Sequence, residues 1–202
     1  MLRIIILAFL IVVLLLTLLI FFQPYVKKQY HLRHFRHYMG RKVYRVAKDY
    51  DYCLLQNFTM QLDSKHTAHF DHILFGDKYF YCVVDKSWKG SVIGSAHDEH
   101  WIYYHPRTNQ KQMIKNPLRV NKTRLEKFSL LTGIDEEMLI SIVVVNDECT
   151  FSCSGLRSDT EYIVHASDFK KLIHEIEHRD VPPFEAQAIE KLVSEVYQLN
   201  KS

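Results

Sequence analysis

The chain has 202 residues, with 26 lysines and arginines against 23 aspartates and glutamates, and 48% of its residues are hydrophobic. It has no internal repeats or low-complexity segments, which excludes a repeat array and leaves room for one folded domain with a core of ordinary size. Its four cysteines are too few and too scattered for a disulfide framework, so we expect reduced, mostly buried thiols. These are Cys53, Cys82, Cys149 and Cys153.

The N-terminal segment predicts a transmembrane helix. Every residue from 4 to 22 is apolar except Thr17, which gives 19 consecutive positions. A helix needs about 20 residues to cross the hydrocarbon core of a bilayer. A signal peptide would have a shorter apolar region that ends in small residues, whereas this one runs through Phe21 and Phe22 into Gln23 and Pro24. We therefore expect an uncleaved membrane anchor at residues 1–24.

The charges around this segment predict its orientation. Only Arg3 precedes the apolar run, while eight lysines and arginines follow it before the first acidic residue, Asp49. The positive-inside rule then predicts a single-pass protein of the cell membrane whose C-terminal domain is cytoplasmic. We expect a basic juxtamembrane segment with the first helix at residues 25–48, and a folded domain at residues 49–202.

The basic juxtamembrane segment predicts contact with anionic lipid headgroups, which attract such clusters. Aromatic and histidine residues are interleaved with its charges, so nucleic acid is the alternative partner. The net charge of residues 49–202 is negative instead. They contain 17 basic and 23 acidic residues, which gives a net charge of −6.

The first half of the domain reads as a helix followed by a meander of strands. Residues 44–50 continue the first helix, and strands are expected at residues 53–62, 69–75 and 78–84. Gly76 and Asp77 suit a tight turn between the last two. A third meander strand is expected at residues 91–94, with another at residues 100–104.

The second half reads as a helix, two strands and two helices. Asn116 and Pro117 open a helix to about residue 131, with Leu118, Leu125, Phe128 and Leu131 on its buried face. Residues 139–145 form a continuous apolar run, which predicts a central strand covered on both faces. A strand at residues 160–165, a helix capped by Ser167 that runs to residue 178, and a last helix starting at residues 180–183 complete a mixed α/β fold.

Around the predicted hairpin, the sequence resembles the nuclease-related domain family. It reads HFDHIL at residues 69–74 and KYFYCVVDKSWKGSVIG at residues 78–94. Members of the family commonly read Q-I-D-H-I, a short hairpin, and then I-E-x-K-x-W-x-G-x-I-x-G. The residues that begin with Asn116 and Pro117 are similar to the family's N-P-x-x-Q helix start. The resemblance covers roughly residues 38–145.

The resemblance implies a restriction-endonuclease-like fold, a mixed sheet flanked by helices, here preceded by one N-terminal transmembrane helix. It also implies a divalent metal held between an aspartate and an E-x-K pair, where the metal activates water and clamps the scissile phosphate. Asp71 and Lys86 match the family's aspartate and lysine. They are the candidate catalytic residues.

The other positions depart from the family pattern. Val84 stands at the glutamate of the E-x-K pair, Arg41 replaces the helix glutamate after Gly40, and Val120 replaces the helix glutamine. Asp85 is one position away from the missing glutamate, and in a regular strand it faces the opposite side from Lys86. One carboxylate beside a lysine and an arginine provides few anionic oxygens for a metal.

We therefore expect a catalytically inactive domain that acts as a binding or interaction module at the cytoplasmic membrane face, with no cofactor. The first alternative is an active nuclease that uses Asp71, Asp85 and Lys86 with Mg²⁺ or Mn²⁺, which requires a bulge that turns Asp85 inward. The second is a structural partner of a membrane complex. If the ligand is nucleic acid, the residues expected to contact it are Arg41, Lys42, Trp88 and Lys89.

No transition-metal site is expected. His66, His69 and His72 are spaced by three, so on a strand they alternate between faces and do not converge. Cys149 and Cys153 lack the second pair of ligands that a zinc signature has.

Overall fold

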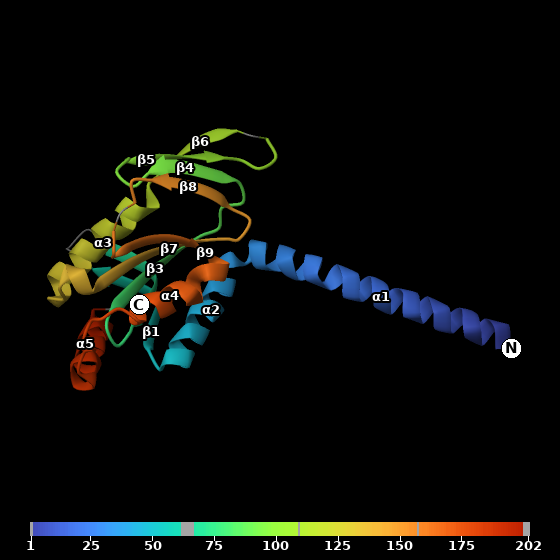
Figure 1. Cartoon of the computed structure of the whole chain (residues 1–202), viewed down its shortest axis with the longest axis horizontal. Helices are drawn as coiled ribbons and strands as arrows, with labels where there is room; N and C mark the ends of the chain where they lie inside the picture. The colour runs from blue at the N-terminus through green and yellow to red at the C-terminus, as the bar shows by residue number, and fades with distance from the viewer. Residues whose placement is uncertain (1, 62–66, 109, 157, 200–202) are drawn as a thin grey trace.

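The computed structural model describes residues 2–61, 67–108, 110–156 and 158–199, but not the side chains of residues 2–9, 11, 12, 27 and 28. Helix α1 (Leu2–Arg33) projects from the domain, and Pro24 lies inside it (Figure 1). Within the described residues, no helix is both long enough and apolar enough to span a membrane. The span predicted at residues 4–22 lies partly outside the described side chains.

Helix α2 (Phe35–Tyr50) follows α1 directly and is amphipathic. Its buried face repeats every three or four residues, as a helix packed on a sheet requires. That face consists of Phe35, Met39, Val43, Val46 and Ala47. Asp51 ends the helix in the left-handed region, with φ of 59°, and its N–H bonds to the Ala47 carbonyl.

Five strands form the larger sheet in the order β1-β2-β3-β7-β9. β1, β2 and β3 are antiparallel neighbours, while β7 is parallel to both β3 and β9. Every residue of β7 is buried, which confirms the predicted strand covered on both faces. The strands are β1 (Cys53–Gln61), β2 (Thr67–Phe75), β3 (Phe80–Lys86), β7 (Leu139–Val145) and β9 (Glu161–His165).

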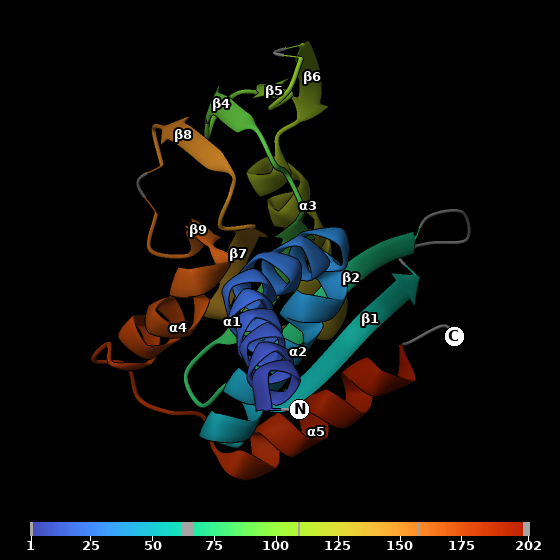
Figure 2. The same cartoon turned by 90° about the vertical axis from the view of Figure 1, so that its right-hand side faces the viewer.

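A second sheet has the order β6-β5-β4-β8. Its β4 pairs in parallel with β8 and antiparallel with β5. Figure 2 shows this sheet above the larger one, on the side where α3 begins. Its strands are β4 (Ser91–Ser95), β5 (His100–Tyr104), β6 (Lys111–Lys115) and β8 (Thr150–Ser154).

The larger sheet is covered by helices on both faces. α2 and α4 (Phe169–Glu177) pack on one face, around Leu74, Val83 and Ile142. α3 (Pro117–Thr132) and α5 (Ala186–Gln198) pack on the other, around Ile73 and Cys82. Successive residues of β2 and β3 therefore face different helices. We call the side of the sheet covered by α2 and α4 the α2 face, and the side covered by α3 and α5 the α3 face.

The turn at Gly76 and the start of α3 were predicted correctly. The Gly76 N–H bonds to the Tyr79 carbonyl at 3.0 Å, which closes the β2–β3 turn. Asn116 caps α3 and accepts hydrogen bonds from two backbone N–H groups. In contrast, Leu131 is 46% exposed rather than part of the buried face of α3.

Other predictions were wrong at the ends of elements and for short strands. The strands predicted at residues 91–94 and 100–104 are present as β4 and β5, but they belong to the second sheet and do not continue the meander of the first, and β6 and β8 were not predicted. Ser167 does not cap α4. It lies in a 3-10 turn (Ala166–Asp168), and its N–H donates to the Asp147 carboxylate at 2.7 Å.

The last helix starts at Ala186, not at residues 180–183. Packing against β3 and a backbone hydrogen bond hold the preceding segment out of a helix. The Phe184 ring stacks on Phe80 with centroids 4.8 Å apart, and the Phe184 N–H bonds to the Asp77 carbonyl. Tertiary contacts thus override the helix start that the prolines favour.

Candidate functional site

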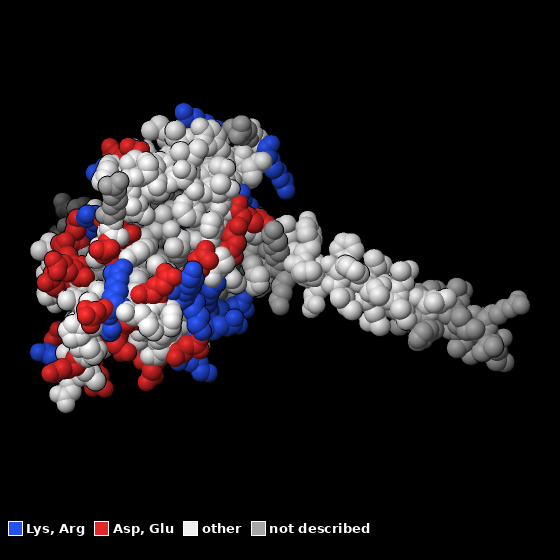
Figure 3. Space-filling model, in the orientation of Figure 1, with Lys and Arg blue, Asp and Glu red and all other residues white. Residues whose placement is uncertain are grey.

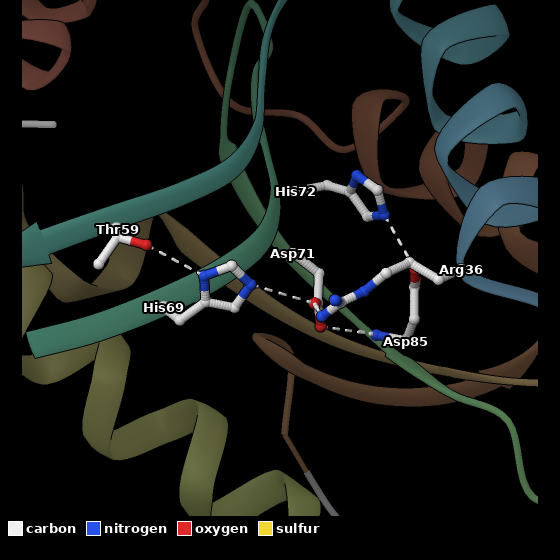
Figure 4. Close-up of polar contacts among 6 residues, drawn as sticks. All are labelled: Arg36, Thr59, His69, Asp71, His72 and Asp85. Atoms are coloured by element: carbon white, nitrogen blue, oxygen red, sulfur yellow. Dashed lines mark hydrogen bonds and ion pairs between the residues drawn. The ribbon is translucent and has the colours of Figure 1, made fainter. Parts of the chain in front are cut away.

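Asp71 is a buried carboxylate near the open end of the β2–β3 pair. Its side chain is 8% exposed, and the guanidinium of Arg36 from α2 forms an ion pair with Oδ1. The backbone N–H of Asp85 donates to Oδ2 at 3.2 Å, and Nε2 of His69 lies 3.6 Å from Oδ1. Figure 4 shows these groups converging on the Asp71 carboxylate.

β2 and β3 separate at this point, so the backbone N–H of Asp85 is available to the Asp71 carboxylate. The β2–β3 pairing ends with His72 opposite Val83. On the other side of β2, Gln56 pairs with His72 and Phe58 pairs with Phe70, but Asn57 and Asp71 between them are not paired. Asn57 adopts a left-handed conformation there, with φ of 52°. The Asp71 side chain thus satisfies the N–H of Asp85 just beyond the last β2–β3 pair.

Asp85 lies on the opposite face and forms a separate pair with His72. Asp85 Oδ2 and His72 Nε2 are 3.0 Å apart, and the two side chains are only 4% and 3% exposed. Burial raises the pKa of Asp85, and the hydrogen bond from His72 opposes that rise. Strand alternation predicted that Asp85 faces away from Lys86, and the Asp85 side chain accordingly binds His72 while only its backbone N–H reaches Asp71.

Lys86 and Val84 share the face of Asp71. Val84 is 2% exposed and presents a methyl-lined surface where the family has a glutamate. Burial lowers the pKa of the Lys86 ammonium, while the charge of Asp71 raises it and the nearby Arg124 lowers it further. The charges of Asp85 and Arg36 also act on Lys86, Asp85 raising its pKa and Arg36 lowering it.

A basic groove extends from this face along α3 and has a volume of about 470 Å³. We call it the α3 groove; its charged and histidine lining consists of His69, Glu99, Lys115, Arg119, Arg124 and Lys127. Val120, at the family's glutamine position, also lines it. Asn116 fixes one end of the groove, because its Nδ2 donates to the carbonyls of Ser95, Ala96 and Asp98.

A second hollow of about 650 Å³ lies beside α2. We call it the α2 hollow; it is lined by Arg33, Arg36, His37, Arg41, Tyr44 and His72, among others. Figure 3 shows lysine and arginine side chains gathered over α2 near the base of α1. Arg36 connects the two regions, since it lines the hollow and also binds Asp71.

The four predicted nucleic-acid contacts lie in different places. Arg41 lines the α2 hollow, whereas Lys42 faces the charges of Asp147 and Asp168, and burial lowers its pKa. Trp88 packs against the cluster between the two sheets, and its carbonyl accepts a hydrogen bond from Asn146. Lys89 is exposed and lines neither the α3 groove nor the α2 hollow as described here.

His69 and His72 face opposite sides of the sheet, as strand parity predicts, while only two of the four cysteines are buried. His69 contacts Thr59 and Asp71 on one face, and His72 contacts Asp85 on the other, while His66 lies outside the described residues. All four cysteines are free thiols; Cys82 and Cys149 are buried, Cys153 is partly buried and Cys53 is exposed. Across the described part of the chain, no three His, Cys, Asp or Glu side chains are grouped to hold a metal ion.

The residues at the E-x-K position do not fit a divalent metal. A magnesium ion needs several oxygens in near-octahedral geometry. Here Asp71 contributes its carboxylate to Arg36, Val84 has no oxygen in its side chain, and Asp85 is bound on the other face. The guanidinium of Arg36 also lies beside the Asp71 carboxylate, and its positive charge opposes binding of a second cation there.

A mixed sheet flanked by helices, with an aspartate and a lysine on one face of two diverging strands, defines a nuclease-like α/β domain. A family model of the nuclease-related domain matches residues 32–146, more than half of the chain. The chain belongs to the nuclease-related domain family, and its sheet and helices are consistent with a restriction-endonuclease-like fold. The searches of curated proteins and of solved structures gave no match.

Sequence reasoning did not identify Arg36 as part of the site. Its partner Asp71 is 35 residues away, and no local pattern links them. One signal was present, since Arg36 is one turn before Gly40 and so lies on the same side of α2. The arginines of α3 were also missed, because a basic helix face most often faces only solvent.

Proposed function

We propose that this protein binds nucleic acid through the phosphate backbone and does not cleave it by a metal-dependent route. The ion pair between Arg36 and Asp71 is the observation that carries this proposal. It pairs the Asp71 carboxylate with a guanidinium, while Asp85, whose charge also acts on Lys86, is bound to His72, so neither carboxylate is free to hold a cation.

The α3 groove supports backbone binding. Four cations line it, and Arg119 and Lys127 on α3 are exposed. Glu99 is the one acidic residue among its described lining. Arginines and lysines arranged along a helix form the electrostatic footprint that phosphate backbones bind.

The N-terminal segment supports attachment of this domain to a membrane, as part of the same proposal. Nineteen consecutive residues at 4–22 are apolar except for Thr17, and the charges that follow favour a cytoplasmic domain. Carbonate extraction of cell membranes tests the attachment, and the chain should stay in the pellet. Protease should reach the domain in inside-out vesicles, and digestion in intact cells would contradict the cytoplasmic placement.

Nucleic-acid assays test the central proposal. The full chain, held in mild detergent, is incubated with single- and double-stranded DNA and RNA, with Mn²⁺ or a chelator. We expect binding that weakens steeply with salt, and no chelator-sensitive products. Replacing Arg119 and Lys127 together by alanine should reduce the salt slope by about 1.4–1.8, because each phosphate contact contributes about 0.7–0.9.

An Arg45→Ala variant is the control for lost charge, since Arg45 is exposed on α2 and is not among the residues that line the α3 groove.

Two outcomes would contradict the proposal. Cleavage products that appear only with Mn²⁺ and vanish in Asp71→Ala would show that the protein is an active nuclease. Absence of binding to any polynucleotide at low salt would instead favour a structural partner of a membrane complex.

A further inference from the structure

The α2 hollow concentrates positive charge. Arg33, Arg36 and Arg41 all line it, together with the imidazole of His37. No aspartate or glutamate is among the described residues that line the hollow. Its lining therefore suits an anion.

The number of guanidinium groups indicates which anion. A guanidinium presents a planar set of donors that matches two oxygens of a carboxylate or phosphate. Three of them exceed what one carboxylate can accept, but they match the three terminal oxygens and double charge of a phosphate monoester. Asp71 holds the guanidinium of Arg36 at the edge of the hollow, which reduces the freedom that Arg36 would lose on binding.

A buried polar group also lines the hollow. His72 is 3% exposed, and its Nε2 is bound to Asp85. Its Nδ1 has no hydrogen-bond partner within the described parts of the chain. A buried polar atom without a partner is unfavourable, and because Nε2–H donates to Asp85, a ligand hydroxyl that donated to Nδ1 would remove that cost. The hollow is thus more than a group of arginines on a surface.

The remaining lining indicates what carries the phosphate. Tyr44 is 59% exposed and lines the hollow one turn from Arg41. An exposed aromatic ring beside a phosphate-binding group is a platform on which a nucleobase stacks. The volume of about 650 Å³ lies within the range of small-ligand sites.

We infer that the α2 hollow binds a nucleoside monophosphate, either free or at the end of a strand, with its phosphate on Arg33, Arg36 and Arg41 and its base on Tyr44. This site is distinct from the α3 groove, because the two lie on the faces of the sheet covered by different helices. The inference does not depend on membrane attachment or on polynucleotide binding by the groove.

Calorimetric titration of the full chain in mild detergent with adenosine 5′-monophosphate tests the inference. We expect Arg41→Ala to weaken binding about tenfold or more, since a charge-assisted hydrogen bond is lost. Arg45→Ala, which removes the same charge one turn further along α2 outside the hollow, should change the affinity less than about twofold. Tyr44→Ala should weaken binding of the nucleotide but not that of inorganic phosphate.

Competition experiments identify the source of the phosphate. If a 5′-phosphorylated oligonucleotide displaces the nucleotide and its unphosphorylated counterpart does not, the ligand is a strand end; if neither displaces it, the ligand is free nucleotide. The inference fails if adenosine binds as well as its monophosphate, or if Arg41→Ala and Arg45→Ala behave alike. Replacing Arg119 and Lys127 should affect polynucleotide binding alone, which separates this result from that of the α3 groove.

Discussion

Replacing Arg36 by methionine removes the cation that holds the Asp71 carboxylate and keeps an unbranched side chain of similar length. Asp71 is 8% exposed at its side chain, so its carboxylate has little water to replace the lost partner. A hydrogen bond to a charged group contributes about 1.5–3 kcal/mol in general. Arg36 is 64% exposed, so solvent screening reduces that contribution, and the Asp85 N–H remains bound to Asp71.

We therefore expect Arg36→Met to lower the free energy of unfolding by about 1–2 kcal/mol, which for a chain of this size lowers Tm by about 2–8 °C. Thermal unfolding followed by circular dichroism measures the change. Arg45→Met is the matched control and should shift Tm little, because Arg45 is exposed on the same helix. An unchanged Tm in Arg36→Met would show that the ion pair contributes nothing to stability.

The same substitution tests why metal is excluded. Arg36→Met alone should gain no stability from Mn²⁺, because Asp71 is left as a lone carboxylate. Adding Val84→Glu places a second carboxylate on the same face, at the position that continues the β2–β3 register opposite Asp71. We expect Mn²⁺ to stabilise this double variant by about 2.7 kcal/mol at a concentration a hundredfold above its Kd. Stabilisation of the unmodified chain by Mn²⁺ that is lost in Asp71→Ala would refute the reasoning.

Two further predictions concern stability. Asn116→Ala should lower the free energy of unfolding by about 2–4 kcal/mol in urea titrations, because it removes the cap of α3 and the side-chain donor of the partly buried bonds to the carbonyls of Ala96 and Asp98. A loss below about 1 kcal/mol would contradict this. Burial raises the folded-state pKa of Glu177, which accepts a hydrogen bond from Tyr81 at 2.5 Å. The stability of the unmodified chain relative to Glu177→Gln should therefore be highest below about pH 4.5 and fall as pH rises through that raised pKa, and a difference that does not vary with pH would contradict it.

Local patterns in the sequence predicted the strongest elements and one part of the site. The buried strand β7, the turn at Gly76 and the cap at Asn116 each depend on neighbouring residues, and the structure has all three. Strand alternation also predicted that Asp85 faces away from Lys86, and the Asp85 side chain binds His72. These features depend on periodicity or backbone geometry, which a single sequence contains.

What the sequence could not predict depends on contacts between distant residues. β8 is short, and it pairs with β4 about 60 positions earlier, from Ser91 opposite Thr150. The start of α5 depends on Phe184 packing against Phe80, and the partner of Asp71 comes from a different helix. Sequence patterns indicated which face of the strands carries Asp71 and Lys86. They did not indicate that the guanidinium of Arg36 would bind Asp71.

The parallel pairing of β3 with β7 affects how this chain must fold as it is synthesised. Phe80 pairs with Leu139, 59 residues later, and most of the second sheet and α3 lie in between. Until residues 139–145 leave the ribosome, one edge of an apolar strand has no neighbour, and such edges template aggregation. A chain truncated before residue 139 should therefore be insoluble, and chaperones that cover exposed strands would be needed for about sixty residues of synthesis.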